Sequence, residues 1–501
     1  MTSSRLAGAR LPHKSAEAPD SSVGADWKRC PAGMPASVGL LPTLVAVIVG
    51  ASLVGSSLIG TEDGFGSLWL ASNASLQLLI AAWLLIRPGS AAAGTLSAGV
   101  LSAFVLVVYG SWAPALAVGK PFSPLVPGAV GKSAMEYTTA AALVVTLGMV
   151  LASSVYAIAR GPGIRVNYRP AVSPSRWWRG VLFMETIGLC CFAAFKVSSH
   201  QPVVSLALFR PLQTGIAQSA ISSNYQFLSA GIDVSIGAAI AASGLFWLKA
   251  YRLQVLALIV GNLFLYTTIG FKYRIVVTMI GAFAVCAATR PHKGRLAPRS
   301  QRVKVVWVGV VLTTMAFFVI QVYRGNHESS QTVTASSFDI GSLESIATSS
   351  IDIATPYAAI HQQHFGLLLG ESYLQLPMLF VPKAIMGSKA VPAMLPLIQA
   401  VTLPGTGAAV PLWAEADANF GLIGLFAFGA ILGWVVSCSD TADRRRMETA
   451  AMAAAIGAVL ASVLSRSLMF FALYEFAAIV YPIWLLSRWG PARETLDPPK
   501  P

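Results

Sequence analysis

The sequence predicts an all-α polytopic membrane protein with about 12 transmembrane helices. Of the 501 residues, 55% are hydrophobic and only 11% are charged, and the mean hydropathy is +0.66. A soluble chain carries roughly 25% charged residues, so this composition is typical of a membrane protein. Apolar stretches long enough to cross a bilayer core of about 30 Å recur along the chain. One long, more polar stretch interrupts them at 324–420.

Two groups of apolar stretches follow a polar N-terminal tail. The tail covers residues 1–37, and no cleavable signal peptide is visible in it. We expect the first nine helices, within 38–323, near 38–60, 67–86, 92–118, 137–159, 180–196, 225–248, 254–270, 275–289 and 305–323. We expect the last three, within 421–487, near 421–438, 449–465 and 468–487, before a second tail at 488–501.

The placement of Lys and Arg predicts the orientation of these helices. If the N-terminus is cytoplasmic, most of the 35 Lys and Arg residues fall in cytoplasmic segments, as the positive-inside rule requires. The rule therefore accounts for the net charge of +14 as an orientation signal, and nucleic acid is not an expected partner. Both termini are predicted to be cytoplasmic, and the long loop at 324–420 is predicted to be extracytoplasmic.

The long loop is expected to contain short helices. Residues 331–360 are rich in Ser and Thr with recurring Ile and Leu, which fits an amphipathic helix on the membrane surface or a poorly ordered linker. Residues 374–400 are apolar and suit a segment that dips into the membrane interface. Prolines argue against one continuous helix there, at Pro377, Pro382, Pro392 and Pro396.

Several basic residues lie on the predicted outer side despite the general bias. Those of interest lie in short turns or in the long loop: Lys272, Arg274, Arg324, Lys383, Lys389 and Arg466. Each can be an interface anchor whose charged end reaches water. Arg also suits bidentate binding of phosphate. If the helices form a bundle, these side chains could converge on an outer pocket for a lipid phosphate or diphosphate.

Three acidic residues lie within predicted spans. Glu185 is near the inner end of its span, Asp233 is in the outer half, and Glu475 is deep in the last span. Acidic groups inside a membrane are costly and are usually paired or functional. Ion pairing between helices and a proton relay are both open interpretations.

The loop also contains acidic residues that could act as a general base. Glu371, Glu415 and Asp417 are candidates, and each could equally be a solvated carboxylate. Glu415 and Asp417 immediately precede Asn419, Phe420 and Gly421, where the chain re-enters the membrane. A site that acts on a lipid-linked substrate is expected at that level.

Two histidines, His361 and His364, stand behind the acidic residues as candidate bases. They are three residues apart, so a helix would place them on one face. No third ligand accompanies them, and the five cysteines show no metal or disulfide spacing. No metal and no cofactor are expected, and no Gly-rich phosphate loop is present.

Two runs of sequence suggest a family. GESYLQLPMLFVPKAIMGSK at 370–389 and AEADANFGLIGLFAFGAILG at 414–433 resemble the bacterial oligosaccharide repeat-unit polymerases of the Wzy type, which make O-antigen and exopolysaccharide. That family shows a Gly-Ser-Tyr stretch, a Pro-Arg, a Lys, and an acidic residue before Asn-Phe-Gly. The chain departs from it at Lys383, where the family often has Arg, and at Ala390, where it often has Pro.

The resemblance implies a glycosyltransferase of the bacterial inner membrane that polymerises undecaprenyl diphosphate-linked oligosaccharides at the outer face. The diphosphate leaving group needs fixed cations. The expected ones are Arg274, Arg324 and Arg466, assisted by Lys383, Lys389 and neighbouring Lys272. Glu415 or Asp417 is expected to act as the base. The implied partners are the bilayer, a flippase and a chain-length regulator.

Two other functions remain open. An O-antigen ligase shares the lipid-linked donor and a large outer loop, but passes glycan to a different acceptor. A flippase or another transporter would suit 12 spans with buried acids, although repeated halves are not visible in the sequence.

Overall fold

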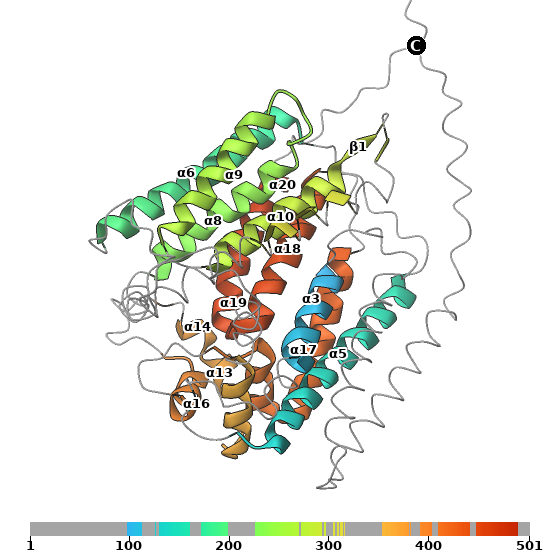
Figure 1. The fold of residues 1–501 in the computed structure, drawn as a ribbon, viewed down its shortest axis with the longest axis vertical. Helices are drawn as coiled ribbons and strands as arrows, with labels where there is room; N and C mark the ends of the chain where they lie inside the picture. The colour runs from blue at the N-terminus through green and yellow to red at the C-terminus, as the bar shows by residue number, and fades with distance from the viewer. Residues whose placement is uncertain are drawn as a thin grey trace, which may run out of the picture.

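The computed structural model of the chain is built from helices (Figure 1). It describes residues 98–112, 126, 130–160, 172–198, 226–269, 272–292, 295–296, 353–379, 381, 391–402, 409–440 and 447–488, with scattered positions between 304 and 315. Among the described residues, five helices are long and apolar enough to cross a membrane, which indicates a membrane protein. The helical fold class is confirmed, whereas the count of 12 spans and the side on which the termini lie stay predictions.

The longer apolar helices that the structure describes fall on predicted spans. The five longest are α5 (Lys132–Arg160), α6 (Pro174–Ser198), α17 (Leu412–Asp440), α18 (Met447–Arg466) and the run α19 (Met469–Glu475), η7 (Phe476–Val480) and α20 (Tyr481–Arg488). The shorter apolar ones are α3 (Ala98–Val107) with η3 (Val108–Trp112), α8 (Gln226–Ser243), α9 (Arg252–Thr267) and α10 (Lys272–Thr289). The expected spans at 38–60 and 67–86, and most of that at 305–323, lie outside the described residues. A two-residue antiparallel pair, β1 (Pro291–His292) with β2 (Arg295–Leu296), follows α10.

The helices form two groups joined by α18. One group contains α6, α8, α9 and α10, and the other contains α3, α5 and α17 (Figure 1). Helix α18 packs against α8 and α10 on one side and against α3 and α17 on the other. Helix α19 continues from α18 after a short turn and also packs against α8.

Helices α5 and α17 pack with their backbones close together. A Cβ atom added at Gly429 would collide with the carbonyl oxygen of Val145, and one at Gly433 with that of Met149. Small residues four positions apart allow this close approach in membrane helices, where dispersion forces drive packing. The GAILG run at 429–433 is therefore the contact surface that aligns α17 with α5.

Polar contacts join helix ends that the predicted alternating topology places on one side. The carboxylate of Asp440, at the end of α17, accepts a 3.0 Å hydrogen bond from the N–H of Ala98, at the start of α3. Glu448, at the start of α18, accepts a 2.6 Å bond from the N–H of Val172, which precedes α6. These pairs agree with helices that run alternately up and down.

The long loop forms short helices where the structure describes it. These are α13 (Glu371–Leu374), α14 (Leu376–Leu379) and α16 (Met394–Val401), so the expectation that the prolines prevent one long helix is confirmed. Residues 353–362 are helical, and most of their side chains are buried in the protein. Neither a surface helix nor a linker describes this part of 331–360, because its alanines and Tyr357 pack inside the protein.

Helix α17 begins at Leu412, before the predicted re-entry at Gly421. It consists of two helical parts that meet at Gly421, whose φ of 59° and ψ of −143° are not helical. A residue with a Cβ atom rarely adopts this conformation. The stretch that contains Glu415, Asp417 and Asn419 is thus a short helix set at an angle on the end of a membrane span.

Candidate functional site

Asp417 is held by two phenols from distant parts of the chain. Tyr137, in the first turns of α5, donates to Oδ1 at 2.7 Å, and Tyr357, in the helix at 353–362, donates to Oδ2 at 2.8 Å. Burial, reinforced by the charge of Asp417, raises the pKa of Tyr357 well above its ordinary value. That phenol therefore keeps its proton and stays a donor. Each oxygen of Asp417 retains lone pairs for a further donor.

His361 lies beside this carboxylate. Its ring stacks on that of Tyr137, with centroids 3.4 Å apart and an interplanar angle of 4°. His364 makes an edge contact with it at 6.1 Å. Burial lowers the pKa of His361 below 6.5, and neighbouring His364 lowers it further, while Asp417 opposes the shift. A neutral imidazole at this position can accept a proton near pH 7.

Glu415 occupies the end of a different helix. Its Oε2 accepts a 2.6 Å hydrogen bond from the N–H of Met469, the first residue of α19. The hydroxyl of Ser372 also reaches this carboxyl. A negative charge is favourable where unpaired N–H groups begin a helix. Glu415 thus fixes α19 against the start of α17.

Asn419 joins the two stretches of sequence that carry the family resemblance. It is fully buried, and its Oδ1 accepts from the N–H of Gly370 at 3.1 Å. Its Nδ2 donates to the Ser372 hydroxyl at 2.7 Å and to the Glu415 carbonyl at 2.6 Å. The N–H of Leu368 adds a 2.8 Å bond to the carbonyl of residue 418. Residues 368–372 and 415–419 therefore form one unit.

An exposed apolar edge lies next to this unit. The rings of Tyr373 and Phe420 stack with their centroids 6.1 Å apart, and Phe420 is 44% exposed. Leu369 and Leu374 are more than 70% exposed, and Ile423, just after the kink in α17, is 80% exposed. This continuity with a membrane span agrees with the prediction of a segment that lies in the membrane interface.

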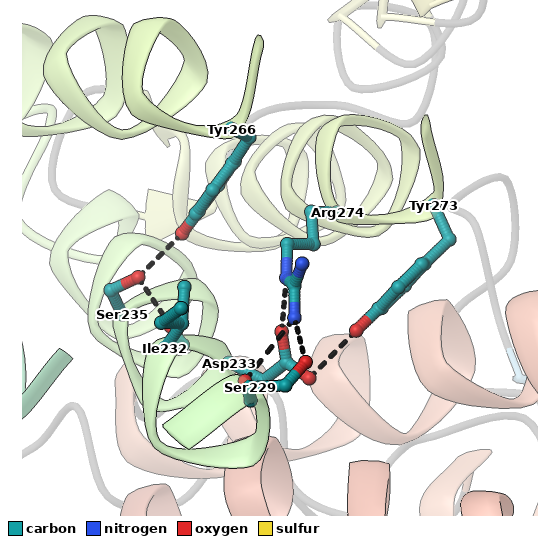
Figure 2. A network of polar contacts seen from close by, with 7 residues as sticks. All are labelled: Ser229, Ile232, Asp233, Ser235, Tyr266, Tyr273 and Arg274. Carbon is teal, nitrogen blue, oxygen red and sulfur yellow. Dashed lines mark hydrogen bonds and ion pairs between the residues drawn. The ribbon is translucent and has the colours of Figure 1, made fainter. Parts of the chain in front are cut away.

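Arg274 belongs to a second network in the other group of helices (Figure 2). Its Nε donates to Oδ1 of Asp233 on α8 at 2.6 Å, and its side chain is fully buried. Its Nη2 donates to the Ser229 hydroxyl at 2.7 Å and to the Ser229 carbonyl at 3.2 Å. Tyr273 donates to Oδ2 of Asp233 at 2.7 Å. Between the two open interpretations of Asp233, the structure therefore shows ion pairing.

Further polar side chains extend this second network toward α6. Ser235 and Tyr266 share a 2.7 Å hydrogen bond between their hydroxyls (Figure 2). Asn262 on α9 donates to Glu185 on α6 at 2.9 Å. The partner of Glu185 is therefore the amide of another helix. Polar groups inside membrane bundles commonly join helices in this way.

The remaining predicted cations are only partly within the described structure. Lys272 is the first residue of α10 and Arg466 is the last residue of α18, but their side chains lie outside what the structure describes. Arg324, Lys383 and Lys389 lie outside the described residues altogether. The convergence of these cations on one pocket stays a prediction.

No sequence pattern points to the phenols that hold Asp417. Tyr137 and Asp417 are 280 positions apart, and Tyr357 and Asp417 are 60 apart, so no local spacing connects them. Tyr137 reads as an ordinary interfacial tyrosine at the end of a span. Lys196 is a further residue that the sequence does not single out. It is buried and donates to the carbonyl of Thr268 at 2.6 Å.

The described residues contain no group of three or more His, Cys, Asp or Glu side chains that could hold a metal ion. Comparison with models of protein families, with curated proteins and with solved structures finds no match to this chain. The chemistry of the site therefore has to be argued from its own residues. A carboxylate held by two phenols beside a neutral imidazole, at the end of a membrane span, can accept a proton from a hydroxyl group.

Proposed function

We propose that the chain is a glycosyltransferase that polymerises undecaprenyl diphosphate-linked oligosaccharide repeat units into a surface polysaccharide. The observation that carries the proposal is the contact made by Asn419, which ties Gly370 and Ser372 to Glu415. The two runs that resemble the polymerases, 370–389 and 414–433, are separated in sequence by residues 390–413. Their meeting at a pair of carboxylates agrees with a shared functional site.

In the proposed reaction, a sugar hydroxyl of one lipid-linked unit attacks the anomeric carbon at the reducing end of the growing chain. The new glycosidic bond forms as the bond to undecaprenyl diphosphate breaks. The hydroxyl proton passes to Asp417, and the electron pair of the broken bond leaves on the diphosphate. Asp417 is the preferred base of the two acids, because the neutral imidazole of His361 lies beside it, whereas Glu415 holds the first N–H of α19.

The leaving diphosphate requires cations that are available to it. Arg274 is engaged by Asp233 and Ser229, so it serves this role less well than the resemblance implies. The cations proposed to bind the diphosphate are therefore Arg324, Arg466, Lys383 and Lys389, together with Lys272. The site would face the outer side of the bacterial inner membrane, with 12 spans and both termini in the cytoplasm.

The experiment uses the purified full chain in liposomes, with undecaprenyl diphosphate-linked repeat unit isolated from a strain that lacks this gene. We expect a ladder of polymer on a gel with wild type and with Glu371→Gln, and single units with Asp417→Asn. Glu371 is the matched control because it is an exposed carboxylate of the same loop. Single units with the wild-type protein would contradict the proposal.

Two other products would identify the alternative functions. Transfer of preformed polymer to a separate lipid acceptor, with no lengthening of the repeat units, would identify a ligase. Movement of the lipid-linked unit across the bilayer without a new glycosidic bond would identify a transporter. The membrane carboxyl of Glu475, which has no cation bound directly to it among the described residues, is the feature that favours this last alternative.

A further inference from the structure

Glu475 is an acidic residue that neither helix packing nor the proposed chemistry uses. It ends α19 and lies close enough to Asp233 and Arg274 for their charges to act on its carboxyl. Within the described residues, no donor lies within hydrogen-bond distance of its buried Oε2 atom. A buried carboxylate oxygen without a donor is unusual and needs a physical explanation.

The charges around Glu475 do not balance if every group is ionised. Asp233 holds the Nε of Arg274, and Tyr273 donates to the other oxygen of Asp233. One guanidinium therefore faces two carboxyl groups, Asp233 and Glu475. Two ionised carboxylates that share one cation leave a net negative charge within an apolar bundle, which costs several kcal/mol by the usual order of magnitude.

Few groups near Glu475 could neutralise it, and η7, which follows it, contains none. Helix α8 contributes Asp233, α10 contributes Tyr273 and Arg274, and α18 contributes the Ser462 hydroxyl. The sequence of α14, LPML, contains no titratable group. Arg466 ends α18, and its side chain lies outside the described structure.

We propose that Glu475 is a proton-binding site, in which the exchangeable proton supplies the charge balance of the Asp233–Arg274–Glu475 cluster. With this proton the cluster has no net charge. Oε2 then carries the proton, so it no longer needs a hydrogen-bond donor. Asp233 is not the proton carrier, because the guanidinium of Arg274 is bound directly to it and balances its charge. The inference does not depend on the glycosyltransferase reaction.

The position of this site links it to the candidate functional site. Glu475 ends α19, and the N–H of Met469, which begins α19, binds Glu415. Six residues of helix separate these ends by about 9 Å. Gain or loss of the proton therefore changes the charge at one end of a rigid helix whose other end is bound to Glu415.

The test uses the full chain in lipid nanodiscs. Infrared difference spectra between mildly acidic and alkaline pH detect the carbonyl stretch of protonated carboxylic acids. We expect Glu475→Gln to lack one band that wild type and Glu185→Gln both show at mildly acidic pH and lose as the pH rises. Glu185 is the matched control, because it is a membrane carboxyl that already has an amide partner. Retention of the band in Glu475→Gln, or no pH-dependent band in wild type, would overturn the proposal.

A second measurement needs no substitution, so it remains valid if the Gln variant does not fold. Dicyclohexylcarbodiimide is soluble in membranes and adds to protonated carboxyl groups. We expect mass spectrometry of the wild-type protein to find the adduct on Glu475, with labelling that declines as the pH rises. Labelling that is absent from Glu475 would contradict the proposal. Protection by sodium ions at constant pH would also contradict it, because a metal ion would then be the ligand.

Discussion

The two polar networks of this protein treat their carboxylates in opposite ways. In the network of α8 and α10, Asp233 is paired with the guanidinium of Arg274 and is closed off by Tyr273. At the start of α17, Asp417 is bound by two phenols and Glu415 by a backbone N–H, all of which are neutral donors. A carboxylate paired with a cation has its charge balanced, whereas the donors to Asp417 and Glu415 bring no positive charge that would oppose the uptake of a proton. The first arrangement stabilises a bundle, and the second preserves a base.

The contacts of Arg274 give it a different role from the one expected. Its expected task was to hold a diphosphate, and in that case Arg274→Ala would leave the protein folded but inactive. The structure shows a fully buried guanidinium with three bonds to Asp233 and Ser229. Loss of this side chain should therefore act first on folding.

The largest expected effect is that of Arg274→Gln, which leaves the Asp233 carboxylate without its cation. Removing one partner of a buried ion pair costs about 3–5 kcal/mol. Thermal unfolding of the protein purified in detergent should show this loss, and Asp233→Asn in the same chain should restore part of it. Arg252→Gln, at an exposed arginine, is the control. A stable Arg274→Gln protein that lacks only polymerisation would assign Arg274 to substrate binding.

Asp417→Asn should have the next largest effect, and it should act on activity. General-base catalysis contributes about 10²–10⁴-fold, so polymer formation in liposomes should fall by about that factor. Stability should change little, because the amide oxygen still accepts from one phenol. Normal polymerisation by the variant would contradict a catalytic role of Asp417. Unfolding as readily as Arg274→Gln would show that Asp417, too, acts on stability.

Gly421→Ala should have a smaller effect, which tests how the second network is positioned. The φ of 59° at Gly421 is strained for any residue with a Cβ atom, at a cost of about 1–3 kcal/mol. We expect a lower unfolding temperature together with reduced polymer formation, because the short helix that contains Glu415, Asp417 and Asn419 would shift. Gly366→Ala, where nothing lies within 4 Å of an added Cβ, is the control and should behave as wild type.

The smallest expected effect is a change in how stability depends on pH. The pKa of His361 in the folded protein lies below 6.5, so the unfolded chain binds more protons as the pH falls through that value. Wild type should therefore lose stability below about pH 6.5. In His361→Gln this part of the slope should be absent, while His364→Gln, at an exposed position, should retain it. Unfolding curves over this pH range provide the measurement. If the free energy of unfolding has the same pH dependence in all three proteins, burial does not lower the pKa of His361.

The sequence predicted the helices well and the site only in part. The apolar stretches at 137–159, 180–196 and 449–465 became α5, α6 and α18, because length and apolarity alone set what can cross a membrane. The acids Glu415 and Asp417 were chosen for their position beside Gly421. Their phenol, amide and backbone partners come from residues far apart in the chain, and no local pattern encodes those contacts.

The sequence by itself determined that this is a helical membrane protein, roughly where its described helices begin and end, and which acidic residues lie at the membrane boundary. Hydrophobic length and the cost of burying a bare backbone act locally, so they can be read from the chain. Only the tertiary structure decided that Arg274 pairs with Asp233, that Asp417 lies between two phenols, and that Glu475 lies near the Asp233–Arg274 pair. The physical reason is that the state of a buried charge depends on which partners the packed helices bring to it.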